Sequence, residues 1–163
     1  MANILVYIDV RDGLISQTAL GALVFARTIA TERGATLYGF VPCAAAPDYA
    51  EDDLCAVLSR HGADKLILAT DPSFAGVVSA ETHGAALVRV CGQIRPMLII
   101  FADRTIASTL GPLVAHWANT PLLTHDAVAM LPDITPLVVE LVHVPAPTPV
   151  SSDEAEVLPF HLG

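Results

Sequence analysis

Short apolar runs alternate along this chain with stretches in which apolar residues recur at helical spacing. The richest runs have strand length, and strands buried on both faces of a parallel sheet show such continuous apolar patterns. Strands are predicted over residues 3–9, 35–42, 64–70 and 97–102, with a fifth beginning within 121–130 and a weaker sixth over 134–144.

Helical patterns follow the first four predicted strands. Ser16 and Gly34 mark the start and end of the first helix. Asp48 and Glu51 form a variant capping box for the second helix, which Gly62 ends. Apolar residues at helical spacing predict two more helices, one through Leu87, Val88, Cys91 and Ile94, the other through Leu110, Leu113, Val114 and Trp117.

The regular alternation of strand and helix predicts an α/β fold. Right-handed crossovers then give a doubly wound parallel sheet of five to six strands. This domain is expected to occupy residues 1–144. Residues 145–163 carry four prolines, two serines and three acids, so they are expected to form a Pro-rich acidic tail.

Composition narrows the class of partner. Hydrophobic residues make up 53% of the 163 positions, but no run of about 18 apolar residues occurs, so no membrane span is expected. A net charge of −9 without a basic stripe excludes nucleic acid as a partner. The N-terminus lacks a secretory signal, and three scattered cysteines indicate reduced thiols, so a cytoplasmic location is expected.

Candidate ligand-binding residues follow the first and fourth strands. In doubly wound sheets, ligands bind beyond the carboxyl ends of the strands, where the strand order reverses. If the first and fourth strands are neighbours, residues 9–13 and 103–109 wall that crevice. Thr124 follows the two leucines of the fifth strand. The candidate binding residues are Asp9, Arg11, Gly13, Arg104, Thr105, Ser108, Thr109 and Thr124.

The hydroxyl-rich stretch after the fourth strand has two interpretations. A helix N-terminus with nearby hydroxyls and Arg104 attracts a phosphate. Ser108 and Thr109 are also residues that cap helices, and Pro112 is expected to limit the helix to about one further turn upstream. Asp9 and Asp103 would repel a phosphate. Capping is therefore the first interpretation and a weakened nucleotide pocket the second.

No catalytic set emerges from the sequence. The glycine motifs of dinucleotide and P-loop sites, the nucleophile elbow GxSxG and the zinc motif HExxH are all absent. The six histidines are dispersed without metal-ligand spacing. An enzymatic activity is therefore not expected, and an enzyme acting on a nucleotide ranks last among the hypotheses.

Three segments resemble the alpha subunit of electron-transfer flavoproteins: MANILVYID with the helix after it, LSRHGADKLILATDP, and RPMLIIFADRTIASTLGPLVAHWANTPLLTHDAVAM. The resemblance runs from residue 2 to about residue 130. It implies the N-terminal domain of that subunit, a Rossmann-like fold of the adenine nucleotide alpha-hydrolase-like type. It also makes FAD or AMP the cofactor to consider.

The chain also departs from that family. Ala107-Ser108-Thr109 and Gly111-Pro112-Leu113 stand where the family has Gly-Arg-Asp and Ala-Pro-Arg, so two arginine positions are neutral. The resemblance stops before the family's C-terminal flavin domain, so no such domain is expected within these 163 residues. The first functional hypothesis is a non-catalytic scaffold or docking subunit of a flavin electron-transfer system, acting as a homo-oligomer or with a flavoprotein partner. The second is an independent binder of AMP, ATP or FAD.

Overall fold

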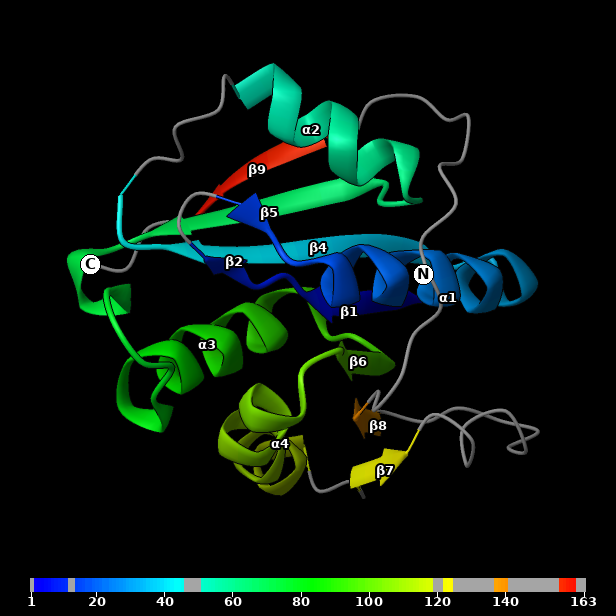
Figure 1. Ribbon diagram of the computed structural model, residues 1–163. Helices are drawn as coiled ribbons and strands as arrows, with labels where there is room; N and C mark the ends of the chain where they lie inside the picture. The colour runs from blue at the N-terminus through cyan, green and yellow to red at the C-terminus, as the bar shows by residue number, and fades with distance from the viewer. Residues whose placement is uncertain are drawn as a thin grey trace.

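The computed structural model describes residues 2–11, 14–45, 51–118, 122–124, 137–140 and 156–160. Its centre is a seven-stranded sheet in which every pair of neighbours is parallel, in the order β7-β8-β6-β1-β4-β5-β9 (Figure 1). A separate short hairpin pairs β2 with β3. The strands of the sheet are β1 (Asn3–Tyr7), β4 (Thr36–Cys43), β5 (Lys65–Thr70), β6 (Leu98–Phe101), β7 (Leu122–Thr124), β8 (Leu137–Glu140) and β9 (Glu156–Phe160); the hairpin strands are β2 (Val10–Arg11) and β3 (Leu14–Ile15).

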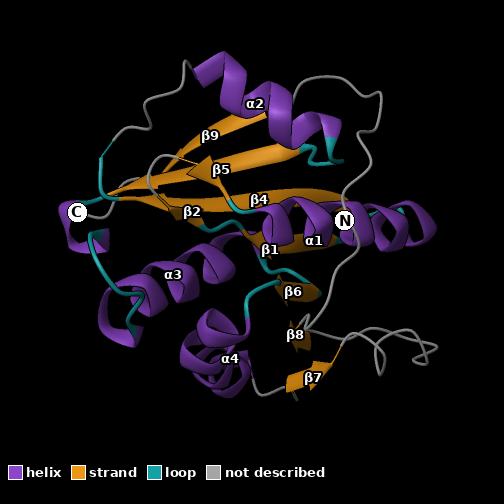
Figure 2. Cartoon of the chain, viewed as in Figure 1, coloured by secondary structure: helices purple, strands orange, loops and turns teal. Residues whose placement is uncertain are grey.

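Helices cover both faces of this sheet, α1 and α2 on one face and α3 and α4 on the other (Figure 2). Each lies between two strands in the chain, as parallel neighbours require. The predicted α/β class with a doubly wound parallel sheet is therefore confirmed. The helices are α1 (Gln17–Arg33), α2 (Glu51–Arg60), α3 (Ala85–Ile94) and α4 (Arg104–Ala118), with a 3₁₀ turn η1 (Pro72–Phe74) and a π-helical turn η2 (Ala80–Gly84).

Two apolar clusters form the core, one on each face of the sheet. Alternate residues of β1 feed them: Ile4 and Val6 pack with α1 and α2, whereas Leu5 and Tyr7 pack with α3 and α4. This division follows from the period of two along a strand. It explains why the central strands read as uninterrupted apolar runs, because both of their faces are buried.

The ends of α1 lie where the sequence predicts them. The Ser16 side chain accepts a hydrogen bond from the Ala19 amide, and Gly34 ends the helix with a left-handed φ of 62°. Between these ends, Arg27 Nη1 donates to the Gly62 carbonyl at 3.0 Å and to Asp64 Oδ2 at 2.9 Å. The same Asp64 oxygen accepts from the Leu37 amide at 2.8 Å. One arginine thus joins α1 to the turn after α2 and to β4.

The fourth helix begins earlier than predicted. It starts at Arg104, directly after β6, and Pro112 lies inside it. Proline within a helix removes a backbone hydrogen bond and typically costs about 3 kcal/mol. Ile106, Leu110 and Val114 are buried in the core on either side of it, and their packing offsets this cost. The prediction that Pro112 limits the start of the helix is therefore wrong.

Part of the segment predicted as a tail belongs to the sheet. Residues 156–160 form β9, which pairs in parallel with β5 from Lys65↔Glu156 to Ala69↔Phe160. The sheet thus has one strand more than the six predicted. β9 lies at the edge of the sheet and contains Pro159, and edge strands are where proline is tolerated. Asp48 of the predicted capping box lies outside the described residues.

No helix among the described residues combines the length and apolarity needed to cross a membrane. Cys43, Cys55 and Cys91 form no disulfide, and all three are buried. Burial raises the pKa of the Cys91 thiol to about 12 and also raises the pKa of Cys43. Both thiols therefore stay protonated at neutral pH and pack as small apolar groups.

Candidate functional site

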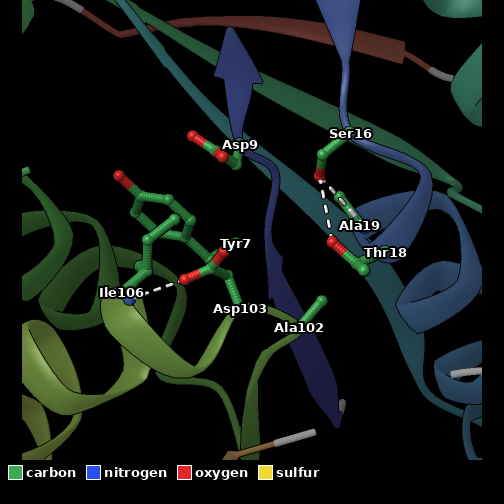
Figure 3. A pocket seen from close by; sticks show the side chains of 8 residues that line it. All are labelled: Tyr7, Asp9, Ser16, Thr18, Ala19, Ala102, Asp103 and Ile106. Carbon is green, nitrogen blue, oxygen red and sulfur yellow. Dashed lines mark hydrogen bonds between the residues drawn. The ribbon is translucent and has the colours of Figure 1, made fainter. Parts of the chain in front are cut away.

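The strand order reverses between β1 and β6, as the sequence predicts. These strands are parallel neighbours, with Ile4 opposite Leu98 and Val6 opposite Ile100. A hollow of about 180 Å³, part of it open to solvent, lies at their carboxyl ends between the starts of α1 and α4 (Figure 3). We call it the β1/β6 hollow. Its lining residues are Tyr7, Asp9, Ser16, Thr18, Ala19, Ala102, Asp103 and Ile106.

On one side of the hollow, the first turn of α1 is capped by its own serine. Ser16 Oγ accepts from the Ala19 amide at 3.2 Å and lies 3.3 Å from the Thr18 hydroxyl. The Ser16 amide in turn donates to the Asp9 carbonyl at 3.0 Å, which fixes the loop between β1 and α1. The hydroxyl of Ser16 therefore holds an amide that would otherwise face a ligand.

On the other side, Asp103 caps α4. Its Oδ1 accepts from the Ile106 amide at 3.0 Å, and its carbonyl accepts from the Ala107 amide at 2.9 Å (Figure 3). A carboxylate is a strong cap, because its charge also complements the positive end of the helix dipole. Asp103 thus places a negative charge where an anionic ligand would have to bind.

Ser108 and Thr109 are not helix caps, which corrects the first interpretation of this stretch. Both lie one turn inside α4, where Ser108 Oγ donates to the Arg104 carbonyl at 2.8 Å and Thr109 Oγ1 donates to the Thr105 carbonyl at 3.0 Å. Hydroxyls within helices commonly bond to the carbonyl four residues earlier in this way. The cap lies five residues before Ser108 because the helix continues through Pro112.

Tyr7 and Asp9 bring a phenol and a carboxylate to the carboxyl end of β1. Tyr7 is 3% exposed, and its ring centroid lies 5.7 Å from that of Phe40 and 5.8 Å from that of Phe101. Burial raises the pKa of the Tyr7 hydroxyl, and the charge of Asp9 raises it further. The phenol therefore keeps its proton at neutral pH and can donate a hydrogen bond but not act as a base.

Apart from Arg11 and Gly13, the predicted binding residues lie in three places: the hollow, α4 and the end of β7. Asp9 lines the hollow, whereas Arg104, Thr105, Ser108 and Thr109 follow along α4 and are not among the lining residues. Thr124 ends β7, which is separated from β6 by β8. Gly13 lies outside the described residues, and of Arg11 only the backbone, in β2, is described.

Of the lining residues, Ile106 lies within the wall segment 103–109 predicted from the sequence but was not among the candidate binding residues, and Tyr7 lies outside both predicted wall segments. Their side chains point into the core cluster of the α3 and α4 face, so the sequence presents them as ordinary core residues. The only available signal was position, because Tyr7 stands two residues before Asp9 on a strand with a period of two. Among the described residues, no group of three or more His, Cys, Asp or Glu side chains is placed to hold a metal ion.

The comparisons with known proteins identify the family. A model of the electron transfer flavoprotein domain matches residues 4–135. The chain belongs to the electron transfer flavoprotein domain family. This membership confirms the resemblance found in the sequence and, with the sheet described above, the Rossmann-like fold that it implied. None of the curated proteins matches the chain.

Two solved structures resemble this electron transfer flavoprotein domain. The universal stress protein from Archaeoglobus fulgidus in complex with dAMP gives a TM-score of 0.48 at 15% identity, covering 85% of this chain and 97% of that chain. A second structure of universal stress protein from the same organism gives 0.47 at 14% identity, covering 85% and 93%. Likenesses at this distance assign no ligand to this chain.

Proposed function

We propose that this electron transfer flavoprotein domain is a non-catalytic docking subunit of a flavin electron-transfer system, with the flavin held elsewhere in the complex. One observation carries the proposal. At the β1/β6 hollow, Ser16 Oγ and the Asp103 carboxylate accept hydrogen bonds from first-turn amides of α1 and α4. At both helix starts where this fold class offers backbone amides to a phosphate, one first-turn amide is therefore already bound by a side chain of the chain itself.

Electrostatics and size support the same conclusion. Asp9 and Asp103 both line the hollow, and their carboxylates would repel a phosphate bound there. The 180 Å³ of the hollow include open solvent, and the space between its lining atoms barely admits a water molecule, whereas pockets for small molecules typically enclose about 300–1,000 Å³. A whole mononucleotide exceeds this space unless the walls move apart.

Exposed apolar side chains support a docking role. Val77 is 87% exposed, Leu14 66% and Trp117 45%. Aromatic residues in particular are enriched at the centres of protein interfaces. We therefore expect at least one of these three positions to contact the partner.

Purification of the tagged chain from its natural source, at its natural level, tests the proposal. A stoichiometric complex with the absorbance and fluorescence of flavin is expected, and Val77→Ser or Trp117→Ser should reduce the amount of flavin recovered. Gln93→Ser is the matched control, since Gln93 is exposed and polar. A chain that stays free of any flavoprotein at natural levels would contradict the docking role.

A second candidate function is the binding of AMP, ATP or FAD in the β1/β6 hollow. Two features favour this function. The hollow lies where the strand order reverses, and the hydroxyls of Ser16 and Thr18 line it as polar groups that a ligand could contact. Nucleotide at about 100 times its dissociation constant would stabilise the protein by about 2.7 kcal/mol. A rise in melting temperature with AMP, ATP or FAD, but not with adenine alone, would favour this function over docking.

A further inference from the structure

A buried histidine joins two turns at the carboxyl end of the sheet. His83 lies in η2, is 3% exposed, and places its ring 4.9 Å from the ring of Phe74 in η1. The π-helical turn is itself unusual, because such turns are rare and occur mostly as single bulges in helices. The electron-transfer role proposed above assigns nothing to this histidine.

The hydrogen bonds around the ring identify its protonation state. The Ser79 amide donates to His83 Nδ1 at 3.3 Å, and a backbone amide cannot accept, so Nδ1 carries no proton. The Thr82 hydroxyl, 2.9 Å from the same nitrogen, must then also donate to it. Ser79 Oγ lies 2.7 Å from Thr82 Oγ1 and accepts from the Thr82 amide at 3.2 Å. This network requires a neutral imidazole.

Burial and nearby charge act in opposite directions on His83. Burial is the larger cause and lowers the pKa of the ring, while a hydrogen bond to the backbone of Phe74 and the charge of Asp9 raise it. Exposed Glu81 is on η2 itself. The elements packed against η2, with their capping residues, carry the following charged or titratable groups: Asp71 before η1, Arg89, Cys91 and Arg95 on or directly after α3, and Asp103, Arg104 and His116 on or before α4.

We propose that His83 is a pH-sensitive latch that holds η2 closed when neutral and opens its first turn when Nδ1 takes a proton from solvent. A protonated Nδ1 presents a hydrogen to the Ser79 amide, so two donors face each other and that hydrogen bond is lost. The Thr82 hydroxyl can rotate and accept, so the disruption begins at the first turn of η2 and reaches beyond it only through the contacts of η2 with α4. The sheet and the other helices stay folded.

The latch has a consequence for the surface around the hollow. η2 continues directly into α3 and packs against α4. A Cβ placed on Gly84 would lie 2.5 Å from Leu113 Cδ2, so the two elements approach closely there. Opening of η2 in acid therefore alters the contacts of α4, the helix whose first turn walls the β1/β6 hollow.

His61 provides a matched control in the same chain. It is also buried, at 8% exposure, but its Nδ1 lies 2.7 Å from the Val57 carbonyl, which can only accept. Nδ1 of His61 therefore already carries a proton. A proton added at Nε2 would leave this hydrogen bond intact, so no part of the chain should open through His61.

Amide exchange and imidazole titration by NMR across pH 7.5 to 4.5 test the latch on the intact chain. Because opening restores an ordinary pKa to His83, each unit by which burial depresses that pKa adds about tenfold to the open population in acid. We expect the Ser79 amide to lose protection as the His83 ring titrates below its ordinary range, while amides of β1 keep theirs. His83→Asn, which retains an acceptor near Nδ1 but does not titrate, should abolish the pH dependence, and His61→Asn should not.

Two results would overturn the proposal. One is a His83 ring that titrates while the protection of the Ser79 amide stays constant. The other is loss of Ser79 protection in acid that persists in His83→Asn. If His83→Asn fails to fold, the wild-type titration alone still decides, because the ring and the Ser79 amide must change over the same pH interval.

Discussion

The two faces of the sheet differ in how closely they follow local rules. Under α1 and α2, the helix ends are a serine cap and a left-handed glycine, and one arginine ties the elements together. Under α3 and α4, a π-helical turn, a buried histidine and a proline inside a helix all occur. Departures of this kind concentrate where a structure serves something other than its own stability. Among these departures, the one to which we assign a function is His83 in η2, on the second face.

The largest effect is expected on the first face, from Gly62→Ala. Gly62 has a φ of +111°, and a Cβ there would lie 2.8 Å from Arg27 Cβ, close to the backbone of α1. Strain and a forced shift of α1 should together lower the free energy of unfolding by about 3 kcal/mol. Urea denaturation measures this value.

Gly34→Ala is the control for this substitution. Gly34 also has a positive φ, of +62°, but no atom lies within 4 Å of its Cβ position. Only the backbone cost of about 1 kcal/mol should remain. Equal losses at Gly62 and Gly34 would show that the contact with Arg27 does not matter.

A smaller effect is expected for Asp64→Ala, which tests the polar connection on the first face. The substitution leaves the Leu37 amide without its acceptor and removes the ion pair with Arg27. Because the pair is partly exposed, most of a loss of about 1.5 kcal/mol should come from the amide. Asp64→Asn keeps an acceptor and should lose less than half as much. A larger loss for Asn than for Ala in urea denaturation would contradict this account.

Asp103→Ala tests the cap on the second face. Loss of a helix cap should lower the free energy of unfolding by about 1 kcal/mol. Asp103→Asn keeps the cap and removes the charge, so its stability should stay close to that of the wild type. Thermal unfolding of the three proteins measures the difference, and an unchanged stability of Asp103→Ala would remove Asp103 as the cap of α4.

The smallest effect is expected for Ser108→Ala and Thr109→Ala. Their hydroxyls bond only to carbonyls within the same helix, and alanine has the higher helix propensity. Each substitution should change stability by less than about 0.5 kcal/mol in either direction. A loss near 1 kcal/mol at either position would restore the interpretation of these residues as caps.

The contrast between the faces also explains which helix ends and strands could be predicted from the sequence. Ser16 and Gly34 were predictable because caps depend on residues within one turn. The start of α4 was not, because the rule against proline in helices was outweighed by burial of Leu110 and Val114, a tertiary effect. β9 was missed for a similar reason, since its pairing with β5 joins residues about 90 positions apart.

The location of the candidate site could be predicted from the sequence, but most of the residues that line it could not. Adjacency of β1 and β6 follows from the topology of doubly wound sheets, and Asp9 was found from it. Tyr7 and His83 were not identified, because their roles depend on which elements pack over them. A buried residue with a polar tip cannot be distinguished from a core residue by periodicity alone.

Calorimetric titration of AMP and ATP into the wild-type chain and Asp103→Asn tests most directly the claim that the chain fills its own anion position. No binding of either nucleotide to the wild-type protein is expected, and Asp103→Asn should gain weak affinity for ATP because one repelling charge is gone while the fold persists. Stoichiometric binding of AMP or ATP to the wild type, unchanged or weakened in Asp103→Asn, would contradict the claim.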